Sequence, residues 1–268
     1  MARKIKKKKT EAPNRQGTII LIGAGVFLAV IAIFLIIFAI VQNVGKGNDT
    51  ASDSSEQIST AASDTEQTGS SVQNSEVSVD IPSTDYMSSV VIDQTKDYYA
   101  DINIRNYGKI TVKLDYEAAP ITTRNFIYLA ESGFYNGLTF HRIMEGFMMQ
   151  GGDPDGNGTG GSEHNIYGEF SDNGYTGNKL SHTRGAISMA RNSFDMNSAS
   201  SQFFIVQTSD HTGSLDGSYA AFGYVTEGIE LVDAVCSDAK PTDDNGSIPR
   251  DQQPVIESVI IHTAVKEA

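Results

Sequence analysis

A run of 24 residues without a charged side chain, 18–41, places the strongest constraint on how this 268-residue chain can fold. As an α-helix the run would be about 36 Å long, and the hydrocarbon core of a membrane is about 30 Å thick. The alternative is a secretory signal cleaved near residue 42, but the apolar region of such a signal spans only about 7–15 residues. The sequence therefore predicts an uncleaved transmembrane signal-anchor helix over 18–41.

Charge is distributed unevenly on the two sides of this run. Residues 1–17 carry seven bases and one acid, a net charge of +6, while the whole chain has a net charge of −13, which leaves −19 for residues 18–268. The positive-inside rule then predicts a cytoplasmic tail over 1–17 and an extracytoplasmic position for everything after residue 41. Because the acidic remainder has no surplus of bases to neutralise phosphates, nucleic acid is not expected as a partner.

The segment after the apolar run has the composition of a spacer. Residues 42–96 are rich in Ser, Thr, Asp, Glu, Gln and Asn and contain few aromatic residues. Such a segment cannot bury enough apolar surface to offset the entropy lost on ordering. We therefore expect a disordered linker over 42–96, with an end-to-end distance of roughly 40 Å.

The pattern changes near residue 98, where apolar and polar side chains begin to alternate. Two alternating runs, 100–105 and 110–115, flank the turn 106–108, which predicts a β-hairpin. Pro120 suits the start of a helix and Gly133 suits its end. Further strands are expected over 139–143, 186–190, 202–207, 221–225 and 255–263, and a second helix over 229–236. Many short strands with two helices indicate a mainly β domain, a closed β-barrel with helical caps.

The most informative segment, 140–153, reads Phe-His-Arg-Ile-Met-Glu-Gly-Phe-Met-Met-Gln-Gly-Gly-Asp. It resembles the signature of cyclophilin-type peptidyl-prolyl cis–trans isomerases. Shorter matching motifs lie at 158–161, 167–170, 188–190, 201–205, 215–217 and 222–223. The resemblance covers about 98–264, and it implies a closed, eight-stranded antiparallel barrel capped by two α-helices over 97–265.

The resemblance also implies an activity, acceleration of X–Pro bond isomerisation in proteins that fold after export. Such a reaction breaks no covalent bond, so it needs no nucleophile, metal or cofactor. The enzyme must bind the twisted amide more tightly than either planar form. The alternative is a binding module or chaperone that grips proline-containing segments with little turnover. Since no acid or base takes part, the rate is expected to stay nearly flat from pH 6 to 9.

The resemblance assigns a role to ten residues. Arg142 is the expected catalytic residue, because a fixed guanidinium can bond the twisted amide. The apolar slot for the proline ring is expected to consist of Phe147, Met148, Phe204 and Leu215, with Tyr219 as an aromatic wall. Gln150 and Gln202 are expected to bond the substrate backbone or to orient Arg142, and the main chain at Ala190 and Arg191 to hold the flanking peptide. On a strand, Phe203 and Phe204 face opposite sides, so Phe203 is expected in the core together with Phe140 and Ile205.

Two positions depart from the best-studied members of the family. Ser214 stands where those members carry a tryptophan that is associated with tight cyclosporin binding, so weak inhibition is expected. Tyr219 stands where a histidine is common, and its ring retains an aromatic wall with a hydrogen-bonding tip. The loop 192–200 also looks slightly longer than in short members of the family.

Other sites are not expected. Residues 153–158 imitate the start of a calcium-binding loop, but the twelfth loop position is His164 instead of the required Glu. The five histidines show no spacing typical of metal ligands. As the only cysteine, Cys236 cannot form an intrachain disulfide and is expected to be a small core residue. The chain is expected to be a protein of a bacterial cell envelope. It is also expected to be a monomer.

Overall fold

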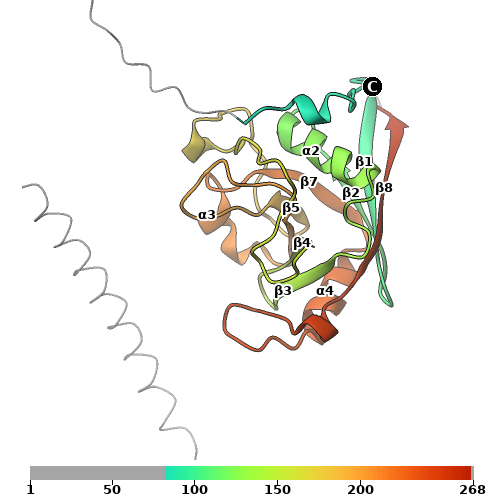
Figure 1. The fold of residues 1–268 in the computed structure, drawn as a ribbon, viewed down its shortest axis with the longest axis vertical. Coiled ribbons are helices and arrows are strands. Elements are labelled where there is room, and N and C mark those ends of the chain that lie inside the picture. Colours follow the sequence, from blue (N-terminus) through green and yellow to red (C-terminus); the bar gives the residue numbers. More distant parts are fainter. Residues whose placement is uncertain (1–81, 267–268) are drawn as a thin grey trace, which may run out of the picture. The chain divides into compact units, whose positions relative to one another are not determined.

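The computed structural model describes residues 82–266, which form an eight-stranded antiparallel sheet (Figure 1). The spatial order of the strands is β3-β4-β6-β5-β7-β2-β1-β8. The strands are β1 (Lys96–Ile104), β2 (Gly108–Leu114), β3 (Thr139–Met144), β4 (Met148–Asp153), β5 (Ala186–Met189), β6 (Phe203–Val206), β7 (Ala221–Glu227) and β8 (Ile256–Val265). The helices are η1 (Asp85–Met87), α2 (Pro120–Glu131), η2 (Ser171–Asn173), η3 (Ser209–His211), α3 (Thr212–Leu215), α4 (Ile229–Asp238) and η4 (Arg250–Gln252).

The sheet curls so that its two outer strands, β3 and β8, approach each other. An isolated antiparallel bridge pairs Thr139 with Val255. The N–H of Ile256 donates to the carbonyl oxygen of Leu138 at 2.8 Å beside this bridge. Eight antiparallel strands in a curled sheet are therefore confirmed, and the two edges meet near the start of β3 and of β8.

The predicted β-hairpin is confirmed. Strand β1 pairs with β2 in antiparallel register, with Ile102 opposite Ile110. The turn between the two strands is formed with positive φ angles, 67° at Asn106 and 123° at Gly108. Both values lie in the left-handed region, which Asn and Gly tolerate better than other residues.

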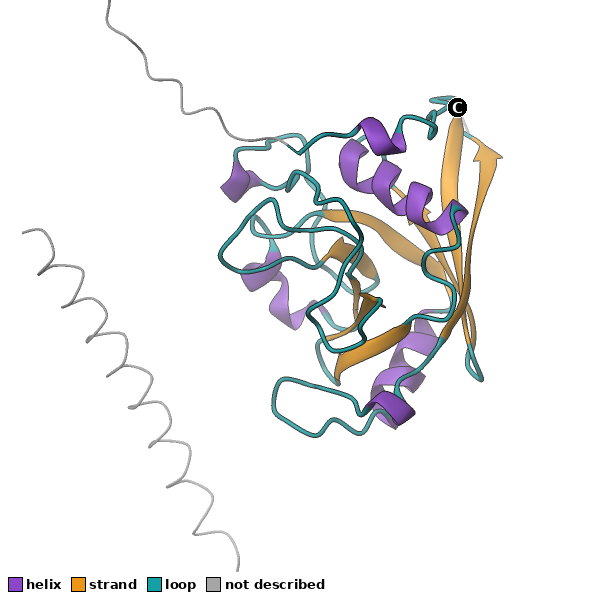
Figure 2. Cartoon of the chain, viewed as in Figure 1, coloured by secondary structure: helices purple, strands orange, loops and turns teal. Residues whose placement is uncertain are grey.

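Both predicted helices are confirmed as α2 and α4, which lie at opposite ends of the curled sheet in Figure 2. Helix α2 begins with Pro120, and the carboxylate of Glu169 caps it by accepting the N–H groups of Ile121 and Thr122 at 2.9 and 2.8 Å. Burial raises the pKa of Glu169, although these two hydrogen bonds oppose the shift. In α4, Cys236 is buried as expected, and burial raises the pKa of its thiol to about 12.

Strand alternation separates two apolar clusters, as predicted. Phe203 joins Phe140 and Ile205 in the main core inside the sheet. Phe204 points to the other face, where it forms a smaller cluster with Met148 and Leu215. One strand therefore supplies side chains both to the core and to the groove on the outside of the sheet.

The prediction of a disordered linker over 42–96 is wrong for its last part. Residues 86–90 pack against α2, and Met87 is fully buried. The Tyr86 hydroxyl donates to Asn125 Oδ1 at 2.8 Å, and the Arg124 guanidinium donates to the carbonyl oxygens of Met87 and Val90. The prediction averaged the composition over residues 42–96, which are mostly polar. The apolar side chains near the end of this segment are enough to hold that end on α2.

The predicted basic tail over 1–17, the predicted span over 18–41 and the first part of the predicted linker lie outside the described residues. Within residues 82–266, no helix combines the length and the apolar character needed to cross a membrane. The sequence predicts that the folded domain begins at residue 97. In the structure it begins earlier, since β1 starts at Lys96 and is preceded by η1.

Candidate active site

Arg142 lies on β3, an edge strand of the sheet, and pairs there with β4. Its partner in the strand register is Gln150, whose Oε1 accepts a hydrogen bond from Arg142 Nη1 at 3.2 Å. Arg142 Nη2 lies 3.2 Å from Met144 Sδ, and Nε donates to the carbonyl oxygen of Asn245 at 2.7 Å. These contacts fix a half-buried guanidinium in one orientation, with its charge retained at neutral pH.

The loop 240–249 supplies the carbonyl group that Arg142 uses. Asp243 shapes this loop, because its Oδ1 accepts the N–H groups of Asn245 and Ser247 at 3.1 and 2.9 Å. Burial lowers the pKa of Arg142, and the nearby Tyr219 and Asp243 oppose the shift. Sequence reasoning missed this loop, since none of the motifs includes it.

Nine of the ten residues that the sequence predicts for the site line one cavity of about 130 Å³, which we call the proline pocket. They are Arg142, Phe147, Met148, Gln150, Ala190, Arg191, Phe204, Leu215 and Tyr219. The buried side chains of Met148, Phe204 and Leu215 form its apolar floor. The Tyr219 ring stands at 88° to the Phe204 ring with 5.8 Å between centroids, so it forms a wall. The pocket thus places an apolar floor beneath a fixed cation.

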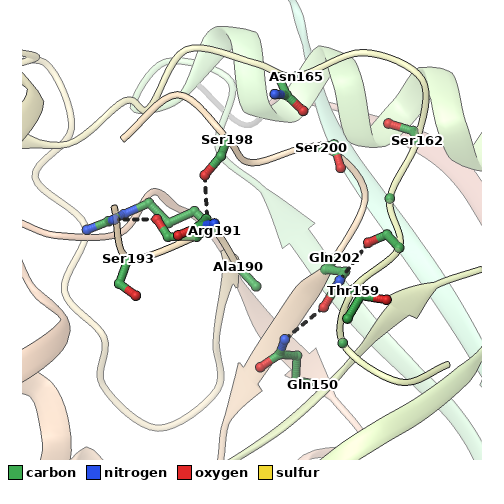
Figure 3. Close-up of a pocket in the computed structure, with 14 residues that line it drawn as sticks. Gln150, Thr159, Ser162, Asn165, Ala190, Arg191, Ser193, Ser198, Ser200 and Gln202 are labelled. Atoms are coloured by element: carbon green, nitrogen blue, oxygen red, sulfur yellow. Dashed lines mark hydrogen bonds between the residues drawn. The ribbon is translucent and has the colours of Figure 1, made fainter. Parts of the chain in front are cut away.

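Gln202, the tenth predicted residue, lines an adjacent cavity of about 650 Å³ together with Gln150, Ala190 and Arg191 (Figure 3). Gln150 Nε2 donates to Gln202 Oε1 at 2.9 Å, and Gln202 Nε2 donates to the carbonyl oxygen of Gly160 at 2.7 Å. A continuous chain of hydrogen bonds therefore runs from Arg142 through both glutamines to the loop at residue 160. The structure brings all ten predicted residues together, and their individual roles remain predictions.

A buried polar group behind the proline pocket escaped the sequence analysis. The ring of His182 stacks on Phe204 at 17° with 6.0 Å between centroids. Its Nδ1 lies 2.7 Å from Asp216 Oδ1, and its Nε2 lies 2.9 Å from Ser188 Oγ. Ser188 and Asp216 belong to motifs that the sequence analysis identified without giving them a role. Their positions show that these motif residues support the floor of the pocket.

The side chain of Arg191 was also missed, because only its main chain was expected to act. Its guanidinium carbon lies 5.2 Å from the Phe170 ring centroid and 4.9 Å from the Tyr219 ring centroid. Nε donates to the carbonyl oxygen of Ser218 at 2.9 Å. A second fixed cation therefore stands at the wall of the proline pocket.

The calcium-like sequence at 153–158 has a structural role. Both carboxylate oxygens of Asp153 accept backbone N–H groups, from Asp155 at 2.8 Å, Asn157 at 3.0 Å and Gly158 at 2.6 Å. Among residues 82–266, no three His, Cys, Asp or Glu side chains are grouped so that they could hold a metal ion. The motif is thus accounted for by a turn beside the groove.

Comparisons with known proteins agree with this geometry. The family model for cyclophilin-type peptidyl-prolyl cis–trans isomerases matches residues 99–265. A peptidyl-prolyl cis–trans isomerase of Helicobacter pylori is 44% identical over 142 residues, which cover 52% of this chain and 82% of the relative. Peptidyl-prolyl cis–trans isomerase B of Bacillus subtilis is 47% identical over 124 residues, 46% of this chain and 80% of the relative.

A solved structure gives the same result for the fold. The cyclophilin-type isomerase of Cryptosporidium parvum, crystallised in the presence of the dipeptide Ala-Pro, superimposes with a TM-score of 0.53 at 31% identity. The match covers 61% of this chain and 98% of the Cryptosporidium chain. This chain therefore belongs to the cyclophilin-type peptidyl-prolyl cis–trans isomerases, and its activity is the isomerisation of X–Pro peptide bonds.

Proposed function

We propose that this isomerase is tethered to a bacterial cell membrane and accelerates X–Pro isomerisation in exported polypeptides by stabilising the twisted amide. Residues 18–41 would anchor the chain, residues 1–17 would stay in the cytoplasm, and the domain would act on the outer side. A catalyst held near the membrane meets polypeptides as they emerge from export, before they have folded.

The observation that carries the mechanism is the fixed guanidinium of Arg142 at the mouth of an apolar pocket. The uncatalysed barrier is about 18–20 kcal/mol, because amide resonance must be lost. A turnover of about 10³ per second corresponds to a barrier of roughly 13 kcal/mol. The site therefore has to stabilise the twisted amide by about 6 kcal/mol relative to the planar forms.

Arg142 supplies donors where the twisted state needs them. As resonance is lost, the prolyl nitrogen regains its lone pair and the carbonyl oxygen swings to a new position. The apolar floor holds the proline ring still while the rest of the peptide rotates. A cation held by Gln150 and Asn245 needs no reorganisation during the reaction, so its interaction with the twisted amide lowers the barrier. The Cryptosporidium relative was crystallised in the presence of the dipeptide Ala-Pro, which contains the kind of bond that this pocket would hold.

The mechanism is tested with full-length protein in detergent micelles, using a protease-coupled X–Pro isomerisation assay. Arg142→Ala is expected to lower kcat/KM by about 10²–10³-fold, the usual loss for a preorganised donor. Arg142→Lys retains the charge without the planar fork and is expected to recover only a small part of the rate. Activity that survives Arg142→Ala in a folded protein would disprove the role of this residue.

The tether is tested separately. The protein is expected to stay with membranes after a high-salt wash and an alkaline carbonate wash, and to be released only by detergent. In cells whose outer layers have been removed, added protease is expected to digest the domain and to spare a tag placed before residue 1. Release by salt alone would indicate a cleaved, secreted form.

A further inference from the structure

A third cavity, of about 690 Å³, shares Arg142, Gln150 and Arg191 with the proline pocket. It extends along the loop at 156–159 to Arg250. The residues that line it include three arginines and neither Asp nor Glu. The whole chain has 33 acidic and only 20 basic residues. A cavity lined by three arginines and no acid is therefore a local concentration of positive charge on one side of the groove.

We call Arg142, Arg191 and Arg250 the basic rim. Of the other three arginines in residues 82–266, Arg105 pairs with Glu257 at 3.2 Å and Arg184 with Asp233 at 2.6 Å, while Arg124 donates to carbonyl oxygens. Within the same described range, no guanidinium of the basic rim lies within 4.0 Å of a carboxylate. The basic rim is held by carbonyl oxygens instead, as when Arg250 Nη1 donates to the carbonyl oxygen of Asp155 at 2.7 Å. Its charges are fixed in position and remain available to an anion.

A buried, unsatisfied side chain lines the same cavity. His141 is only 5% exposed, and neither of its ring nitrogens has a hydrogen-bond partner among the described residues. Buried polar groups in native proteins nearly always have a partner. Both ring nitrogens are shielded from solvent, so the imidazole forms part of the cavity wall, and the three guanidinium groups supply the donors that a ligand can reach.

Two carboxylates on this side of the groove are engaged in backbone hydrogen bonds. Asp153 accepts three backbone N–H groups in the turn beneath the cavity. Asp243 accepts the N–H groups of Asn245 and Ser247 and interacts with Arg142 only through the electrostatic field. These two acids shape the loops and form no ion pair with the basic rim.

We propose that the cavity beside the basic rim is a subsite for an acidic side chain, Asp or Glu, within two residues of the proline in the substrate. The proposal rests on the function proposed above, because the same groove holds the X–Pro bond. An extended peptide advances about 3.3 Å per residue, so a side chain near the proline reaches a cavity that shares three residues with the proline pocket. The preferred substrates are therefore acidic segments that contain proline.

The test uses full-length protein in detergent micelles and a set of short alanine-based peptides, each with one X–Pro bond. Glu, Gln or Lys is placed in turn at each of the two positions before the proline and each of the two positions after it. Rates are measured by NMR exchange between the cis and trans forms, which avoids a coupling protease. At one position or more, the catalysed rate is expected to be about 5–10-fold higher for Glu than for Gln and lower for Lys. The advantage of Glu is expected to shrink at high salt.

Arg250→Gln is the most selective variant, because Arg250 lies outside the proline pocket. It is expected to leave the rate for the Gln peptides unchanged and to reduce the advantage of Glu to about 2-fold or less. Arg191→Gln is expected to reduce the same ratio. The matched control is Arg105→Gln, which removes an equal charge from a residue that lines none of the three cavities. Thermal unfolding checks that each variant is folded.

Equal or slower rates for Glu than for Gln at all four positions would overturn the proposal, as would a Glu preference that survives both Arg250→Gln and Arg191→Gln. Failure of the isomerase itself would show differently, as the absence of catalysis for every peptide. In that case, NMR titration of the same peptides would still test the acidic subsite through binding alone. Tighter binding of Glu than of Gln peptides would support the subsite, and equal binding would overturn it.

Discussion

The Nε atom of Arg142 donates a 2.7 Å hydrogen bond to the carbonyl oxygen of Asn245, although 103 residues separate the two in sequence. One residue comes from strand β3 and the other from the loop between α4 and η4. The hydrogen bond engages the Nε edge of the guanidinium, while Nη1 donates to Gln150 and Nη2 lies against Met144 Sδ. The orientation of the proposed catalytic group therefore depends on a loop that carries no family motif.

Asp243→Ala is expected to lower kcat by about 10-fold with little change in KM. The substitution removes the carboxylate that accepts the N–H groups of Asn245 and Ser247, so the loop and its carbonyl group lose their fixed position. A misplaced group costs transition-state stabilisation more than ground-state binding. Steady-state kinetics measure the effect, with the neighbouring Asp244→Ala as control. Equal losses in both variants would mean that net charge, and not the loop geometry, is responsible.

Inhibition by cyclosporin is expected to be weak and to strengthen when Ser214 is replaced by Trp. The Ser214 side chain is exposed and donates to the carbonyl oxygen of His211, and it does not line the proline pocket. A Trp there could cover the inhibitor with a large aromatic surface, which is worth about tenfold or more in affinity. Titration of isomerase activity with cyclosporin measures the change. An unaltered inhibition constant in active Ser214→Trp would contradict the expectation.

The catalysed rate is expected to vary less than about twofold from pH 6 to 9, since a guanidinium remains charged throughout. Burial lowers the pKa of Arg142, but Tyr219 and Asp243 oppose the shift. No proton moves in the proposed mechanism. Initial rates in buffers of constant ionic strength provide the measurement. A bell-shaped profile centred in this range would point to general acid–base catalysis instead.

Stability is expected to fall as the pH decreases from 7.5 to 5.5. Burial lowers the pKa values of His141 and His182, although Asp153 and Asp216 respectively oppose the shift. The unfolded chain therefore takes up protons near pH 6.5 while the folded chain does not, so the stability is fully present above that pH and is lost below it. The urea midpoint of the full chain in detergent measures this trend.

Glu169 acts in the opposite direction, because burial raises its pKa. Comparing the wild type with His182→Gln cancels the effect of Glu169 on the pH dependence, since both proteins retain Glu169. The variant is expected to show a shallower decline than the wild type. The same decline in both proteins would exclude His182 as a source of the pH dependence.

Met87→Ala is expected to destabilise the domain by about 2–4 kcal/mol, the usual cost of emptying a buried methionine site. Met87 is fully buried where residues 86–90 pack against α2. Val91→Ala provides the control, because Val91 is 82% exposed, and it is expected to change stability by less than about 0.5 kcal/mol. Equal midpoints for both variants in urea would mean that this segment contributes nothing to the fold.

The sequence alone determined those features that depend on neighbouring residues. The hairpin formed by β1 and β2 follows from period-2 alternation around a turn that Asn106 and Gly108 can adopt. Helix α2 follows from Pro120 and Gly133 at its two ends. The opposite directions of Phe203 and Phe204 follow from the geometry of any strand. The motifs at 140–153 and beyond identified ten site residues, which the structure brings together in two adjoining cavities.

Only the tertiary structure decided which distant groups complete the site. The carbonyl group of Asn245, the buried His182 and the unpaired side chains of the basic rim come together because the sheet curls and brings loops from far along the chain to one face. The packing of Met87 on α2 was likewise hidden, because it depends on a surface that exists only after the helix has docked. Periodicity and composition report each residue's local preferences, whereas these contacts depend on pairs of residues that become neighbours only in the folded chain.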